Sequence, residues 1–341
     1  MTQLFPAFLL AAATTAFAAA QDTKAPAKAD PKSPPKTEAK TDPKRQPKVV
    51  GIPPTEANVP YGTHPRQVLD FWKAKSETPT PVMFAIHGGG WVNGDKSGYR
   101  GAAKTFLDAG ISVVAINYRM VTEATEKGIE PPVKWPLEDA ARALQFVRSK
   151  AKEWNIDKVR IGATGGSAGG CSSLWLLYHD DLADPKSADP VARESTRLYC
   201  AAVIGAQTTL DPLPLREWMP NARYGGHAFA IRTAENRDGS FQKFFENREK
   251  LLPWIKEYSP LTHVSAGDPP VFLEYPSQKK PPVKGEEQTD PTHSALLGMI
   301  LMEKLKAEKV EGILVYPGQT DAKYKNSTEY LIGTLKEKPG R

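Results

Sequence analysis

The stretch with the clearest chemical potential is residues 160–173, RIGATGGSAGGCSS. Ser167 lies there in a G-x-S-x-G pattern, after an apolar run and before a segment with the composition of a helix. A serine on such a strand-to-helix turn is presented as a nucleophile, and the start of the helix favours negative charge beside it. Because a serine hydroxyl is a weak nucleophile, it needs a base to take its proton.

A second glycine-rich stretch, IHGGGWVNGD at residues 86–95, follows an earlier apolar run. Glycines in such a loop can aim backbone N–H groups at an oxyanion, because no Cβ stands in the way. The N–H of Ala168 would be the other donor. A tight turn with no further role is the alternative. We expect His87 to brace the loop, and Trp91 either to wall an acyl pocket or to cover the core.

Several stretches resemble the α/β-hydrolase superfamily: HGGGW, AINYR, PLEDAARALQFVR and GGSAGG. The likeness is greatest to the esterase branch of hormone-sensitive-lipase and BD-FAE feruloyl-esterase-like proteins, over residues 82–170 and again over 259–273. The resemblance implies hydrolysis of a carboxylic ester by a Ser, Asp/Glu, His triad with Ser167 as nucleophile, and no cofactor is expected. It also implies an oxyanion hole formed by Gly88, Gly89 and Ala168.

The base and the acid are harder to place, because the chain departs from the family pattern at both positions. The family histidine follows the last strand in a P-G-x-G-H run, where this chain has YPGQTDAKY and places Asp321. The family acid follows the strand that PVFLEY matches, in an H-G-x-x-D run that this chain lacks. Of the six histidines, His293 follows that strand and starts a helix on the same side of the predicted sheet as Ser167.

One hypothesis is therefore an exchanged relay, in which His293 is the base and Asp321 orients it. In the alternative, His293 caps its own helix near Asp290 and Asp321 is a turn residue, since Asp-x-x-His before an apolar run fits that interpretation. A base from a partner protein or from the substrate is another alternative. The chain could also be a degraded hydrolase that binds a ligand, because loss of the base removes orders of magnitude of rate.

The elements that must position these residues alternate between strand and helix. Apolar runs predict buried strands at residues 81–86, 111–118, 158–165, 198–206, 270–275 and 311–317. Composition, periodicity and stop signals predict helices at residues 100–109, 136–154, 167–179 and 292–309. This order predicts an α/β fold, the α/β-hydrolase fold, with a mostly parallel sheet covered by helices and a ligand site at the carboxyl ends of the strands.

Residues 207–258 form an insertion that we expect to cap the pocket. It is rich in aromatic residues, and FQKFFENREKLLPWI at 241–255 predicts one amphipathic helix. Aromatic residues at this spacing pack more often than they bind, although some could line an acyl or sugar pocket. The two cysteines, Cys171 and Cys200, are expected to be buried thiols, with a disulfide as the alternative. The Cys/His spacing suggests no metal site.

The amino-terminal segments predict export. Residues 1–20 are apolar and end in three alanines, which is typical of a signal peptide. Residues 21–48 are rich in Lys and Pro and predict a disordered linker, with possible tethering to the cell envelope, before a hydrolase domain at 49–341. Eight basic residues against four acidic ones give this linker +4 of the chain's net +6. The basic balance is therefore no argument for nucleic acid binding.

Overall fold

The computed structural model describes residues 51–232 and 237–337. The chain divides into two units after Lys48, and the described residues belong to the second unit. The predicted signal peptide (1–20) and linker (21–48) lie outside the described residues. In the part of the chain that the structure describes, no helix is long and apolar enough to cross a membrane.

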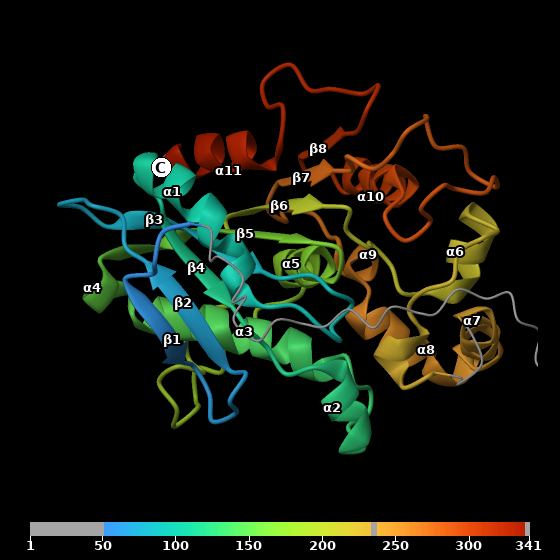
Figure 1. Ribbon diagram of the computed structural model, residues 1–341, viewed down its shortest axis with the longest axis horizontal. Helices are drawn as coiled ribbons and strands as arrows, with labels where there is room; N and C mark the ends of the chain where they lie inside the picture. Colours follow the sequence, from blue (N-terminus) through green and yellow to red (C-terminus); the bar gives the residue numbers. More distant parts are fainter. Residues whose placement is uncertain (1–50, 233–236, 338–341) are drawn as a thin grey trace, which may run out of the picture. The chain divides into compact units, whose positions relative to one another are not determined.

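The framework is an eight-stranded sheet of order β1-β2-β4-β3-β5-β6-β7-β8 (Figure 1). β2 is antiparallel to β1 and β4, and all pairs from β4 to β8 are parallel. The prediction of a mostly parallel sheet is confirmed, and the predicted strands are β3 to β8. The strands are β1 (Glu56–Pro60), β2 (Val68–Trp72), β3 (Thr80–Ile86), β4 (Ser112–Ile116), β5 (Ile156–Gly166), β6 (Cys200–Ile204), β7 (Val271–Glu274) and β8 (Gly312–Val315).

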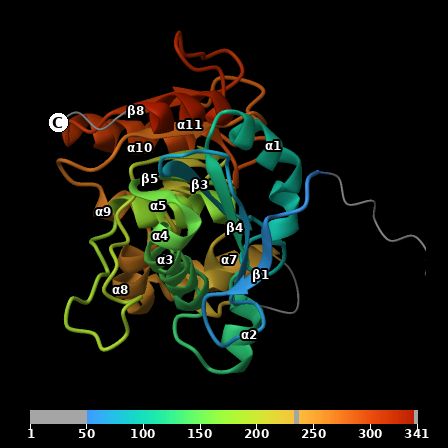
Figure 2. The ribbon, with the colours of Figure 1, turned by 90° about the vertical axis from the view of Figure 1, so that its left-hand side faces the viewer.

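Helices cover both faces of this sheet (Figure 2). Side chains of β3 alternate between two cores: Phe84 belongs to the core that includes residues of α3, α5 and α10, whereas Met83 belongs to the core that includes residues of α1 and α11. Alternation with period two is why one strand serves both layers. The helices are α1 (Arg100–Asp108), α2 (Val121–Glu126), α3 (Lys134–Ser149), α4 (Ala151–Trp154), α5 (Ala168–Tyr178), α6 (Pro212–Trp218), α7 (Arg237–Glu246), α8 (Arg248–Tyr258), α9 (Pro260–His263), α10 (Ala295–Ala307) and α11 (Ser327–Lys336).

The two cysteines are free thiols, as expected. Both are buried, but Cys171 belongs to the core on the α5 face and Cys200 to the core on the α11 face. The sheet therefore separates them. Burial raises the pKa of both thiols far above the usual range, so both stay protonated.

The insertion 207–258 folds as α6, a 3-10 helix (η2, Gly226–Phe229), α7 and α8. The prediction of a single helix over 241–255 is wrong, because α7 ends and α8 begins at Asn247. The Asn247 side-chain amide donates to the carbonyl of Lys243 at 2.8 Å, which satisfies the end of α7 in the way a capping residue does. The rings of Phe229 and Phe244 stack within the insertion, with their centroids 5.4 Å apart, so these two aromatic side chains pack against each other.

Candidate active site

Ser167 stands on the sharp turn between β5, which ends at Gly166, and α5, which begins at Ala168. Its φ of 53° and ψ of −124° are a conformation that L-residues seldom adopt. The Ser167 N–H donates to the carbonyl of Ile204 at 2.9 Å, and its carbonyl accepts from the N–H of Cys171 at 2.9 Å. These bonds to neighbouring elements hold the strained residue at the carboxyl edge of the sheet.

Glycines around Ser167 are required by close backbone contacts. A Cβ on Gly169 would lie 2.1 Å from the carbonyl oxygen of Ile86, and one on Gly165 would lie 2.4 Å from the carbonyl carbon of Gly169. Any side chain at either position would force α5 away from β3 and β5. The G-x-S-x-G pattern thus sets how closely the helix approaches the sheet.

His293 faces the Ser167 hydroxyl from the loop between β7 and α10. Its Nε2 lies 2.9 Å from Ser167 Oγ. The backbone at Gly205 makes room for this loop, since a Cβ there would lie 3.3 Å from the Cβ of His293. Gln207 also pins the loop, because its side-chain amide donates to the carbonyl of Thr292 at 2.7 Å. The structure therefore brings together the two residues that the sequence proposed as nucleophile and base.

The carboxylate beside His293 is Asp290. Its Oδ2 accepts from His293 Nδ1 at 2.8 Å, and its Oδ1 accepts from the Thr292 N–H at 3.1 Å. The Asp290 carbonyl also accepts from the His293 N–H at 3.2 Å. Acid and base are thus held in one short turn, and a proton on Nδ1 leaves Nε2 free to accept the Ser167 proton.

Asp321 does not take the part expected of it, so that element of the exchanged relay is corrected. Its Oδ1 accepts from the N–H groups of Lys323 and Tyr324, both at 2.8 Å, and these bonds lower its pKa. These bonds make Asp321 a turn residue. The carboxylate that contacts His293 Nδ1 is that of Asp290. The helix-cap alternative for His293 is also wrong: Ser294 is the N-cap of α10.

Gly88, one of the expected oxyanion residues, lies against this turn. A Cβ on Gly88 would be 2.5 Å from the Gly166 carbonyl oxygen and 3.5 Å from Ser167 Cβ. Within residues 51–232 and 237–337, no hydrogen bond has the N–H of Gly88, Gly89 or Ala168 as its donor. These three N–H groups are therefore unpaired within the described residues.

His87 braces this loop, as the sequence suggested. Its ring is buried and stacks on Tyr118 with centroids 4.2 Å apart, and its Nδ1–H donates to the Gly88 carbonyl at 2.8 Å. The Tyr118 hydroxyl donates to the His87 carbonyl at 2.8 Å. Burial lowers the pKa of His87 to about 4, so the ring is neutral near pH 7.

Trp91 does not line the cavity at Ser167, so the pocket-wall expectation is wrong and its alternative holds. Its indole is buried in the core on the α5 face, and Nε1 donates to Ser172 Oγ at 3.0 Å. Ser172 Oγ donates in turn to the Ala168 carbonyl at 2.9 Å. Trp91 therefore fastens the glycine loop to α5.

The cavity at Ser167 has a volume of about 480 Å³. Ile204 contributes an apolar wall with 41% of its surface exposed. Asp95 contributes a carboxylate. Burial would raise its pKa, but hydrogen bonds from Asn117 and Ser97 prevail and lower it to about 2, so Asp95 is charged.

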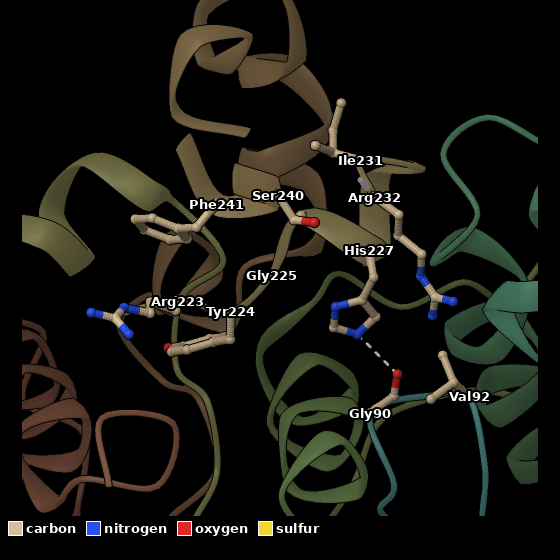
Figure 3. Close-up of a pocket in the computed structure, with 11 residues that line it drawn as sticks. Gly90, Val92, Arg223, Tyr224, Gly225, His227, Ile231, Arg232, Ser240 and Phe241 are labelled. Atoms are coloured by element: carbon tan, nitrogen blue, oxygen red, sulfur yellow. Dashed lines mark hydrogen bonds between the residues drawn. The ribbon is translucent and has the colours of Figure 1, made fainter. Parts of the chain in front are cut away.

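A second cavity, of about 360 Å³, lies between the glycine loop and the insertion (Figure 3). Gly90 and Val92 line it from the loop, and Tyr224, His227 and Phe241 line it from the insertion. His227 Nε2 donates to the Gly90 carbonyl at 2.9 Å, which joins the insertion to the loop.

The fold is that of an α/β-hydrolase, and the family match places the chain in the esterase branch. The BD-FAE family model matches residues 69–283, and the chain belongs to this family. It is 30% identical over 235 residues to "Probable carboxylic ester hydrolase LipM" of Mycobacterium tuberculosis, with 64% of this chain and 46% of LipM covered. The chain thus spans less than half of the length of that relative.

Solved structures show the same fold. An acetyl ester-xyloside bifunctional hydrolase from Caldicellulosiruptor lactoaceticus matches with a TM-score of 0.57 and 23% identity, covering 78% of this chain and 86% of that one. A truncated carbohydrate esterase from gut microbiota matches with a TM-score of 0.59 and 18% identity, covering 83% of this chain and 96% of that one. The predicted resemblance and fold class are confirmed.

Proposed function

We propose that this protein is an exported serine carboxylesterase that acts on small or carbohydrate-linked esters. The observation that carries the proposal is the continuous relay at the sheet edge. Ser167 Oγ lies 2.9 Å from His293 Nε2, and His293 Nδ1 lies 2.8 Å from Asp290 Oδ2. These are the contacts that activate a serine for acyl transfer.

In the proposed reaction, His293 Nε2 takes the Ser167 proton while Oγ attacks the ester carbonyl carbon. The N–H groups of Gly88, Gly89 and Ala168 donate hydrogen bonds to the negatively charged oxygen that forms. Such stabilisation usually supplies a large part of the rate enhancement. His293 then gives the proton to the leaving alcohol oxygen as the C–O bond breaks. A water molecule, deprotonated by His293, then attacks the acyl carbon, and His293 returns the proton to Ser167 Oγ as the acyl–Oγ bond breaks and the acid leaves. Asp290 holds the tautomer and stabilises the imidazolium.

The cavity supports a small acyl group and a hydroxylated alcohol. Its volume of about 480 Å³ suits a small ligand, and Ile204 offers apolar surface beside Ser167. The charged Asp95 carboxylate can accept hydrogen bonds from sugar hydroxyls. The names of the two solved neighbours, an acetyl ester-xyloside hydrolase and a carbohydrate esterase, favour the same substrate class.

The test compares turnover of p-nitrophenyl acetate and of an acetylated xylo-oligosaccharide. Ser167→Ala should lower kcat on both by about 10⁴-fold or more, because the nucleophile acts only in concert with its base. Ser277→Ala is the matched control, since Ser277 lines the same cavity; it should stay within about threefold of wild type, as most surface substitutions do. Undiminished turnover by folded Ser167→Ala would overturn the proposal.

A binding module without turnover is the weaker second candidate. Its motivation was the lack of a histidine at the family position after the last strand. His293 lies against Ser167 from another loop, which removes that motivation.

Export is tested separately: the mature protein from the natural host should lack residues 1–20 by mass spectrometry, and retention of these residues would contradict export.

A further inference from the structure

Three side chains of types that can bind a metal ion converge at the carboxyl-terminal end of α5, the end remote from Ser167. His179 follows the last residue of α5, Glu257 lies in the last turn of α8, and His263 ends α9. Each offers one ligand atom, and these atoms lie within 4.8 Å of one another. The two imidazole rings have centroids 4.7 Å apart.

The hydrogen bonds of His179 determine which nitrogen carries its proton. Nδ1 lies 2.9 Å from the Asp180 carbonyl oxygen, which can only accept, so Nδ1 is the donor. In the neutral ring, Nε2 then presents a lone pair. That lone pair faces Glu257 Oε1 at 3.0 Å, which also presents lone pairs. Two acceptors at this distance repel each other unless a cation lies between them or the ring gains a second proton.

His263 is oriented in the same way. Its Nε2 lies 2.6 Å from the Glu257 carbonyl oxygen, so Nε2 is the donor and Nδ1 keeps the lone pair. The same carbonyl accepts from the Trp175 indole N–H at 2.8 Å, which holds it in place. Each imidazole thus donates one N–H to a backbone carbonyl and keeps the other nitrogen for a ligand. This is the hydrogen-bond pattern of metal-bound histidines.

Another His–Glu pair on this chain shows the contrast. His64 Nε2 also lies 3.0 Å from a carboxylate, that of Glu123. There, however, the N–H of Arg66 donates to His64 Nδ1 at 3.1 Å, so Nε2 carries the proton and donates to Glu123. The pair is balanced as donor and acceptor, whereas the pair at His179 is not.

We propose that His179 Nε2, His263 Nδ1 and the Glu257 carboxylate bind a divalent transition metal ion, with Zn²⁺ the best match. Two imidazole nitrogens and one carboxylate are a ligand set that suits Zn²⁺, with water at the fourth position. Mg²⁺ and Ca²⁺ prefer oxygen ligands to imidazole nitrogen. Glu257 has 45% of its side chain exposed, so the ion has a path from solvent. Spacing along the sequence did not suggest this site, because the ligands come from three separate helices.

The position of the site indicates a structural role. The 11 residues of α5 separate it from Ser167 by about 17 Å. A bound ion would join the end of this helix to α8 and α9, through which the chain returns from the insertion to the sheet. The ion should therefore stabilise the folded state and leave the chemistry at Ser167 unchanged.

The test uses the untagged full chain, stripped of metal by a chelator. Titration with ZnCl₂ in a calorimeter should give one ion per chain, and saturating Zn²⁺ should raise Tm by several degrees, because a ligand of the native state stabilises it. His263→Ala and Glu257→Gln should each weaken Zn²⁺ binding by at least about tenfold and reduce the Tm shift at the same Zn²⁺ concentration. His64→Ala, the matched control, should retain both.

Two results would overturn the proposal: wild type that binds no Zn²⁺, or binding that neither variant weakens. Glu257→Gln preserves side-chain shape, so it keeps the test decisive if His263→Ala fails to fold. Ester turnover is measured on the same samples and should be equal in wild type and Glu257→Gln. Failure of the esterase proposal would therefore not alter the calorimetric result.

Discussion

Replacing Asp290 by Asn tests the relay at the point where the sequence-based hypothesis and the structure disagree. The amide keeps the shape of the carboxylate, so the turn with Thr292 and His293 should form. It cannot stabilise the imidazolium that forms when Ser167 loses its proton. We therefore expect kcat for p-nitrophenyl acetate to fall while the free energy of unfolding changes little.

The size of the loss follows from the exposure of the pair. The side chains of Asp290 and His293 are 42% and 33% exposed, so solvent screens their interaction. Unit charges about 4 Å apart interact by about 1 kcal/mol in water and about 4 kcal/mol at an effective dielectric constant of about 20. Each 1.36 kcal/mol is tenfold in rate, so kcat should fall by about 5-fold to 1000-fold. A fully buried triad acid costs about 10⁴-fold, so this loss should be smaller.

The matched control is Asp321→Asn, which changes the carboxylate that the exchanged relay required. Because Asp321 accepts from backbone N–H groups in its own turn and does not contact His293, kcat should stay within about twofold of wild type. Wild-type kcat for Asp290→Asn, or an equal loss in both variants, would refute this assignment of the acid.

Other predictions concern packing and pH. Gly169→Ala should cost at least about 3 kcal/mol in urea unfolding, because its Cβ would lie 2.1 Å from the Ile86 carbonyl oxygen. Gly101→Ala, with open space around its Cβ, should gain about 0.5–1 kcal/mol, and equal midpoints for the two variants would contradict this. Since the pKa of His87 is lowered to about 4 in the folded state, the unfolded state binds the proton first, and stability should fall as pH drops from 6.5 towards 4. At pH 4.5 this loss should be about 2–3 kcal/mol relative to pH 7, measured by urea unfolding; His87→Gln should lack this component, and the same pH dependence in both proteins would disprove it.

The parallel strands were predictable because each is a short apolar run with a turn signal after it. The antiparallel pair was not predicted. β1 is half exposed, so it lacks an apolar run, and β2 contains the buried Asp70. That carboxylate is tolerated because the buried Lys96 ammonium lies 2.9 Å away. The partner lies 26 residues away in the sequence, at the start of a 3-10 helix (Lys96–Tyr99), so no local pattern reveals it.

The site was predictable where local sequence dictates geometry. Ser167 and the glycine loop follow from close backbone contacts that only small residues allow. His293 was expected on the same side of the sheet as Ser167, and the structure places it there. Asp290 was considered only as part of a helix cap, because an Asp three residues before a His fits both interpretations. The choice between them depends on Ser294, which caps α10 and frees Asp290 for His293.

The most direct test of the central claim, that His293 activates Ser167 for attack, is the rate at which a fluorophosphonate labels the folded protein, followed by peptide mapping. We expect one adduct, on Ser167, and labelling slowed by at least about 100-fold in His293→Gln, since a general base contributes about 10²–10⁴-fold. No adduct on Ser167 under conditions that label a control serine hydrolase, or an unchanged rate in His293→Gln, would contradict the claim.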